Sequence, residues 1–222
     1  MNYYLLAIVA FIITSLAQTL VSFRYNKYKK VLNYKKISGF EVAKQILEEH
    51  NLSDIYVVET KGYLSDHYDS NAKVVRLSTD VFHGEDIAAC AIAAHEASHA
   101  IQHNEGNFFI KLRGFIFPLV NFSSKIGYIV ILLGLFFGIL DLFYLGIGLL
   151  CIILIFQLIT LPVEFDASRK ALSDLEKFNI LSDIENNDAK KVLTAAALTY
   201  VASLASTILE VLRLLLLARD RN

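Results

Sequence analysis

Long apolar stretches alternate with polar regions along the chain, and the first apolar stretch begins at the N-terminus. Tyr3 to Phe23 contains no charged residue. At about 1.5 Å of rise per residue, a helix over this stretch crosses the roughly 30 Å core of a bilayer. A cleaved signal peptide would start with basic residues, whereas here the basic residues follow the apolar stretch. We therefore expect a transmembrane anchor over residues 1–23.

Two further apolar stretches predict a transmembrane hairpin. Pro118 to Leu140 and Leu142 to Leu161 are each long enough to span a bilayer, and Gly138 and Asp141 mark a short turn between them. We assign residues 115–161 to this hairpin, which returns the chain to the side of the membrane that it left.

A last apolar stretch leaves two alternatives open. Ala195 to Ala218 is long enough to span, but it contains Glu210 and Arg213. The C-terminal element, residues 191–222, is therefore either a fourth span or a helix that lies against the other helices.

The polar region between the first two apolar stretches, residues 24–114, begins with a predicted helix and a small sheet. Ser38 and Glu41 have the spacing of a capping box, which predicts a helix that ends near His50. Short alternating segments separated by turn residues then predict three strands of a small antiparallel sheet. These segments are Ile55 to Glu59, Tyr63 to Tyr68 and Lys73 to Ser78.

An alanine-rich helix follows the predicted strands. Glu85 and Asp86 provide an acidic first turn, and the helix is expected to continue to about Asn104 before Gly106 ends it. Together these elements predict an α+β fold, in which a multi-pass helical membrane protein carries a small antiparallel sheet and one helix with candidate chemistry.

Composition and charge are typical of a membrane protein and argue against a nucleic-acid-binding protein. The chain has 222 residues, of which 55% are hydrophobic, and a mean hydropathy of +0.47. The chain has 21 basic and 22 acidic residues, so it lacks the excess of positive charge that binding to the phosphates of nucleic acid requires. The basic residues cluster between Arg24 and Lys36, which places residues 24–114 on the cytoplasmic side of the cell membrane. Cys90 and Cys151 occur singly in apolar surroundings and suggest no disulfide.

The alanine-rich helix contains His95-Glu96-Ala97-Ser98-His99, which is an H-E-x-x-H motif. Two histidines four residues apart lie on the same helix face, so both imidazoles can bind one zinc ion. Glu96 lies beside that face, where it can act as the general base towards the attacking water of a peptide hydrolysis. The motif alone is of moderate specificity, and polar surface residues are the alternative interpretation.

A catalytic zinc site requires a third protein ligand, and Glu164 is the best candidate. Glu164 follows the predicted hairpin directly, in the segment 162–190, which we expect to form a helix that begins at Pro162 and a loop. The hairpin brings this segment back to the side of the membrane where His99 lies. The alternative is that Glu164 is an interfacial carboxylate paired with Arg169 or Lys170.

Three other histidines receive weaker assignments. His103 is one further turn along the helix, about 12 Å from His95, and is expected at the surface. His67 and His83 lie near the predicted strands and the helix start, where a histidine can stabilise a transition state but is more often solvated. We retain His67 as a candidate near the site.

The chain resembles the YugP-type membrane zinc metallopeptidases, small multi-pass bacterial proteins. The resemblance covers nearly the whole chain, and its most specific parts are Leu161 to Leu172 and Leu193 to Tyr200. By analogy with HtpX-like membrane proteases, which share the gluzincin plan, it implies that Glu164 is the third ligand. In many gluzincins an aspartate four residues after this glutamate orients a zinc-binding histidine. Here that position is Ser168, and Asp166 is a nearby carboxylate that can take the same role. Ser168 and Asp166 are therefore the candidate supporting residues.

These patterns predict a zinc metalloendopeptidase of the membrane with one Zn²⁺ per chain. His95, His99 and Glu164 are the expected ligands and Glu96 the expected catalytic base. The expected substrates are peptides or membrane-protein loops, bound in extended form by addition to the strand nearest the zinc. The main alternative is a metal-binding or scaffolding membrane protein without turnover. A transporter has less support, because few polar residues lie in the middle of the spans.

Overall fold

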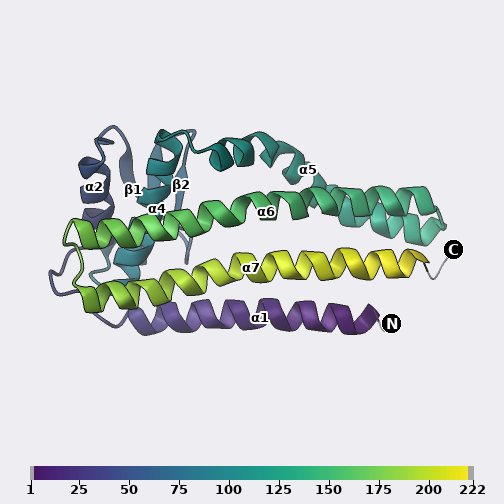
Figure 1. The fold of residues 1–222 in the computed structure, drawn as a ribbon, viewed down its shortest axis with the longest axis horizontal. Helices are drawn as coiled ribbons and strands as arrows, with labels where there is room; N and C mark the ends of the chain where they lie inside the picture. The colour runs from purple at the N-terminus through teal and green to yellow at the C-terminus, as the bar shows by residue number, and fades with distance from the viewer. Residues whose placement is uncertain (1–2, 220–222) are drawn as a thin grey trace. The chain divides into compact units, whose positions relative to one another are not determined.

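The computed structural model describes residues 3–219, so the first two residues of the expected anchor and the last three residues of the C-terminal element lie outside it. Within this range the chain forms helices α1 to α7 and strands β1 to β3 (Figure 1). The residues divide into two compact units. Within the described residues, the membrane unit comprises residues 3–18, 109–162 and 198–219, and the site unit comprises residues 19–108 and 163–197.

The membrane unit is built from parts of four helices, each long and apolar enough to span a bilayer. At most 28% of the apolar window of any of them is buried, so most of this apolar surface faces outward, as contact with lipid requires. The chain is therefore a multi-pass membrane protein, and the last apolar stretch is among the candidate spans. The four helices are α1 (Tyr3–Tyr28), α5 (Phe108–Phe137), α6 (Leu140–Lys177) and α7 (Asp183–Arg219).

Glycines allow α5 and α6 to form a tightly packed hairpin. Gly138, with φ of +69°, makes the turn between the two helices, a conformation that residues with a Cβ rarely adopt. At Gly134 a Cβ would lie 2.6 Å from the backbone nitrogen of Phe143, and at Gly146 it would lie 2.4 Å from Ile131. Small residues therefore let the two backbones approach closely, as is common between helices in membranes.

Helix α6 differs from the sequence expectation at Pro162. The expectation that Pro162 begins a new helix is wrong, because α6 continues without interruption to Lys177 (Figure 1). A proline inside a helix removes one backbone hydrogen bond. Val163, Ala167 and Ala171 follow at helical spacing and are almost completely buried, and the packing of this face favours continuation of the helix.

The sheet of the site unit has the order β1-β3-β2. Strands β1 (Tyr56–Thr60), β2 (His67–Asp69) and β3 (Val74–Ser78) confirm the three predicted strands. Their pairing is mixed rather than antiparallel throughout, because β1 pairs with β3 in parallel and only β2 pairs with β3 in antiparallel orientation. The most apolar strand, β3, takes the centre with Val75 and Leu77 fully buried, which leaves the more polar β1 and β2 at the edges.

The helices of the site unit pack around this sheet. Helix α2 (Gly39–Glu49) begins with the predicted capping box, in which the Ser38 amide donates to the Glu41 carboxylate at 2.7 Å. A short helix, α3 (Thr79–His83), precedes α4 (Ile87–Asn104), where Asp86 caps the N-terminus instead of lying in the first turn. Gly39 lies so close to α3 that a Cβ would be 2.2 Å from the Val81 carbonyl oxygen. The result is one buried core that holds α4 in a fixed position.

Candidate metal centre

Helix α4 can lie at the centre of the site unit because half of its side chains are those of alanine, cysteine or serine. A helix that is apolar on nearly all sides is stable only when it is buried on nearly all sides. Asp86 fixes its start by accepting a hydrogen bond from the Ala89 amide at 2.9 Å, and the Ser98 hydroxyl, fully buried, donates to the Ala94 carbonyl oxygen at 2.8 Å. The alanines that are almost completely buried are Ala88, Ala89, Ala91, Ala93, Ala94, Ala97 and Ala100.

The structure brings together His95 and His99 of α4 with Glu164 of α6. Their potential ligand atoms all lie within 4.8 Å of one another. Oε2 of Glu164 is 3.3 Å from Nε2 of His95 and 3.6 Å from Nε2 of His99. The Glu164 side chain is only 2% exposed, and the two histidine side chains are 14% and 13% exposed. Two imidazole nitrogens and one carboxylate oxygen therefore face a common point.

The spacing of these atoms fits a single divalent ion. Ligand atoms about 2.0 to 2.1 Å from a tetrahedrally bound zinc lie roughly 3.3 Å from one another, close to the two distances between Glu164 and the histidines. Two imidazoles and a carboxylate are also a donor set that zinc favours. His95, His99 and Glu164 would hold the ion, which leaves a further coordination position for water or substrate.

The electrostatic surroundings of His99 favour a positive charge at this point. Burial lowers the pKa of His99, but the hydrogen bond with Glu164 and the charges of Glu96 and Glu164 outweigh burial and raise the pKa above its ordinary value. A bound cation benefits from the same two carboxylates. The site unit thus places two carboxylates beside the imidazoles, and both favour a cation there.

Arg169 and Lys170, the alternative partners of Glu164, form ion pairs with other carboxylates. Arg169 contacts Asp166 at 2.5 Å, and Lys170 contacts Glu105 at 2.8 Å. The Glu164 carboxylate instead points towards the two histidines of α4. This placement agrees with a ligand role for Glu164.

Glu96 lies next to the three donors but is not one of them. It is 9% exposed, and within residues 3–219 its carboxylate takes part in no hydrogen bond. Its oxygens are not among the fully buried unpaired atoms, so water can reach them.

Gln102 supports the site, although the sequence patterns did not predict it. Its side chain is fully buried, its Oε1 lies 3.0 Å from Nδ1 of His99, and its amide nitrogen donates to the Val163 carbonyl oxygen and to Asp166. Residues three apart share a helix face, so a glutamine three positions after the second histidine was the available signal. Asp166, a predicted supporting residue, therefore reaches His99 through Gln102.

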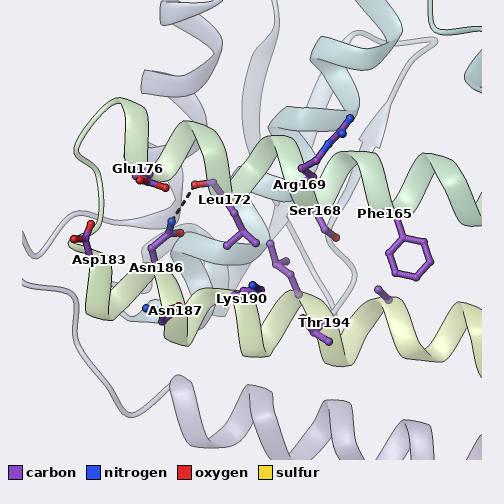
Figure 2. Close-up of a pocket in the computed structure, with 12 residues that line it drawn as sticks. Phe165, Ser168, Arg169, Leu172, Glu176, Asp183, Asn186, Asn187, Lys190 and Thr194 are labelled. Atoms are coloured by element: carbon purple, nitrogen blue, oxygen red, sulfur yellow. Dashed lines mark hydrogen bonds between the residues drawn. The ribbon is translucent and has the colours of Figure 1, made fainter.

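Ser168, the other predicted supporting residue of α6, contacts the first histidine. Its Oγ is 3.3 Å from Nδ1 of His95, on the ring edge opposite the nitrogen that faces Glu164. Ser168 also lines a pocket of about 580 Å³ between α6 and α7 (Figure 2). One wall of this pocket includes Phe165 and Leu172 of α6, and the facing wall includes Lys190 and Thr194 of α7.

The histidines with weaker assignments lie outside this group of donors. His67 is exposed on β2, and its Nδ1 is 2.8 Å from the Ser65 carbonyl oxygen. His83 contacts the Glu59 carboxylate at 3.3 Å. His103 is exposed on α4 and its ring packs edge-on against Tyr68 of β2. In these positions none of the three rings contributes a ligand atom to the His95, His99 and Glu164 cluster.

Fold and site together define a multi-pass membrane protein with a candidate site for one metal ion. The chain belongs to the family described as "Putative neutral zinc metallopeptidase", whose sequence profile matches residues 3–219. It is similar to the "Putative membrane protease YugP" of Bacillus subtilis (strain 168), with 41% identity over 225 residues that cover 100% of both chains. No solved structure matches the chain.

Proposed function

We propose that the protein is a zinc-dependent endopeptidase of the cell membrane, with His95, His99 and Glu164 as metal ligands and Glu96 as the general base. The observation that carries this proposal is the convergence of three donor atoms, from two partly buried histidines of α4 and the buried Glu164 of α6, near the Glu96 carboxylate, which has no hydrogen-bond partner among the described residues. The family match supports the metal and the class of reaction. One zinc ion per chain is expected, because the three donors surround a single point.

The chemistry divides between the ion and the protein. When bound, zinc acts as a Lewis acid that polarises the substrate carbonyl and makes a bound water more acidic. Glu96 takes a proton from the attacking water as the new carbon–oxygen bond forms. It then gives that proton to the leaving amine as the peptide bond breaks, so the carboxylate is regenerated. Glu164 keeps the two imidazoles close together and supplies negative charge.

The edge strand β2 is the proposed docking place for an extended substrate. It pairs with β3 on one side only, and Tyr68 packs against His103 of α4, the helix of the metal site. An unstructured peptide or a membrane-protein loop can add to such an edge through main-chain hydrogen bonds. The basic cluster that follows the first apolar stretch supports a cytoplasmic position for the site unit, and hence for these substrates.

Replacement of Glu96 by Gln separates this proposal from a metal-binding protein without turnover. The detergent-purified wild type should cleave fluorescein-labelled casein, and Glu96→Gln should reduce the rate by at least about 100-fold, the usual scale of general base catalysis. Zinc content should stay near that of the wild type, because Glu96 is not a ligand. Glu105→Gln, on the residue that follows α4, is a matched control that should retain the rate. Undiminished cleavage by Glu96→Gln would exclude Glu96 as the base, and zinc binding without cleavage of any peptide by the wild type would favour the scaffolding alternative.

A further inference from the structure

Gln102 joins the two segments that supply the metal ligands. It lies on α4 with no exposed surface, and its side chain crosses to α6, where the amide nitrogen donates to the Val163 carbonyl oxygen at 3.0 Å and to Asp166 at 2.8 Å. Val163 directly precedes Glu164. Through these bonds Gln102 fixes the ligand-bearing turn of α6 against the helix that carries His99.

The partners of the amide determine which way it points. A backbone carbonyl oxygen and a carboxylate only accept hydrogen bonds, so the group that faces Val163 and Asp166 must be the amide NH₂. Both of its hydrogens are then used. The Gln102 oxygen is therefore the atom that faces Nδ1 of His99 at 3.0 Å, and an oxygen of this kind only accepts.

This orientation requires a proton on Nδ1 of His99, whereas the partner of His95 Nδ1 imposes no such requirement. His99 must carry a proton on Nδ1 to donate to Gln102, so in the neutral ring the lone pair lies on Nε2, the atom that faces Glu164 at 3.6 Å. His95 is different, because Nδ1 faces the Ser168 hydroxyl, which can both donate and accept. On the Nδ1 side of the two rings, His99 alone therefore has a partner that can only accept.

We propose that Gln102 is a positioning residue that holds His99 in its metal-binding tautomer and places Glu164 opposite it. The proposal rests on the proposed function in that the ligand set is the same. It assigns to an uncharged amide, on the ligand helix itself, the task that a carboxylate performs for many metal-binding histidines. The amide also acts on both ligand segments at once, which a carboxylate, having no hydrogen to donate to Val163, cannot do.

Zinc affinity tests the proposal in the full-length protein. Gln102→Met keeps the length of the side chain but removes acceptor and donors, and it should weaken zinc binding about 10- to 100-fold in competition with a chromophoric chelator. The matched control is Gln157→Met, on the same α6 helix as Glu164, where the native amide donates to Ser203. This control should bind zinc as the wild type does. Equal affinity of Gln102→Met and the wild type would overturn the proposal.

Asp166→Ala tests whether Gln102 acts on His99 or only bridges the helices. This variant removes one acceptor of the amide but leaves the bonds to Val163 and His99, so its loss of affinity should be smaller than that of Gln102→Met. The variant also gives a measurement if Gln102→Met does not fold. An equal or larger loss in Asp166→Ala would contradict the assigned role.

The tautomer itself can be read without metal. In metal-free protein labelled with ¹⁵N-histidine, the ring couplings of His99 should show a proton on Nδ1, whether or not Nε2 also carries one towards Glu164. Gln102→Met should lose this preference, whereas a residue with a purely structural role would leave it unchanged. A proton on Nε2 alone, with none on Nδ1, would refute the inference. Failure of the wild type to bind zinc would instead refute the proposed function, and the tautomer would still report on Gln102.

Discussion

Oε2 of Glu164 lies 3.3 Å from Nε2 of His95, although 69 positions separate the two residues in the chain. The contact joins α6 to α4 and is buried, since only 2% of the Glu164 side chain is exposed. A carboxylate held this close to two imidazoles by the protein alone is well placed to share a cation with them. Metal binding should therefore depend on this contact.

Zinc content should depend on Glu164. The wild type, purified in detergent without chelators or metal-affinity tags, should contain about one zinc per chain by mass spectrometry, as a single three-ligand site requires. Glu164→Ala removes one ligand and should lose the metal or bind it more than about 100-fold more weakly, beyond the range for supporting residues. Glu176→Ala, a carboxylate exposed on the same helix, is the matched control and should keep its zinc. A full complement of zinc in Glu164→Ala would show that the third ligand lies elsewhere.

Metal removal should destabilise the site unit, because the ion joins α4 to α6. An ion present at about 100 times its dissociation constant stabilises the folded state by roughly 2.7 kcal/mol. A chelator should therefore lower the thermal unfolding temperature of the wild type, and added zinc should restore it. Glu164→Ala should show little response to either. A wild-type unfolding temperature that is insensitive to both additions would argue against a site that binds the folded state.

Sequence patterns predicted most elements of this fold, and the exceptions have physical causes. Hydrophobic length predicted the spans, and the capping box placed the start of α2 correctly. The pairing of β1 with β3 was not predicted, because strand patterns specify which face of a strand is buried and not which neighbour it pairs with. The continuation of α6 through Pro162 depends on tertiary packing of the residues that follow, which local propensity does not contain.

The candidate site was predicted to a similar degree. The H-E-x-x-H spacing by itself places His95 and His99 on one helix face, and the predicted hairpin brings Glu164 near them. The supporting contacts do not follow from spacing in the same way. Whether Gln102 turns its oxygen to His99 depends on Val163 and Asp166, which lie on another helix. Such contacts depend on how α6 is rotated against α4, and no spacing rule gives that rotation.

The capping box should make stability depend on pH. Hydrogen bonds from the Ser38 amide and hydroxyl lower the pKa of Glu41 below its ordinary value of 4.5. A lowered pKa in the folded state means that ionised Glu41 stabilises the fold above pH 4.5 and that this contribution is lost as the pH falls through the folded-state pKa. Ser38→Ala should cost about 1 kcal/mol at pH 7 in chemical unfolding.

The difference between wild type and Ser38→Ala should shrink in acid, because protonated Glu41 no longer attracts the hydroxyl. Ser70→Ala, in the exposed turn between β2 and β3, serves as the control and should change stability by less than about 0.5 kcal/mol. A gap between wild type and Ser38→Ala that stays constant from pH 7 into acid would mean that the cap acts without Glu41.

Close packing around Gly39 should make α2 sensitive to a single methyl group. In Gly39→Ala the new Cβ would meet the Val81 carbonyl oxygen at 2.2 Å, and the nearby backbone of Ala89 limits any shift. Overpacking of this kind costs about 1 to 3 kcal/mol, despite the better helix propensity of alanine. Gly114→Ala is the matched control, since no atom lies within 4 Å of the added Cβ. Unfolding of Gly39→Ala at wild-type denaturant concentration would show that α2 and α3 can separate enough to accept the methyl group without cost.

Ser168 offers a way to strengthen the site. The Ser168 hydroxyl is 3.3 Å from Nδ1 of His95, but a hydroxyl does not select one tautomer of the ring. Ser168→Asp would place a carboxylate there, which only accepts and therefore favours the proton on Nδ1 and the lone pair on the Nε2 that faces Glu164. The pocket of about 580 Å³ that Ser168 lines gives the longer side chain room.

Zinc affinity of Ser168→Asp should therefore rise, by between about threefold and tenfold in chelator competition, since supporting carboxylates raise the basicity of histidine ligands. Ser173→Asp adds the same charge to an exposed position of α6 and should leave the affinity near that of the wild type, which separates the local hydrogen bond from a general effect of charge. If both variants tightened binding equally, long-range attraction would suffice as the cause. Weaker binding by Ser168→Asp alone would contradict the prediction. It would mean that His95 binds the ion through Nδ1 and not through Nε2, the nitrogen that lies beside Glu164 in this structure.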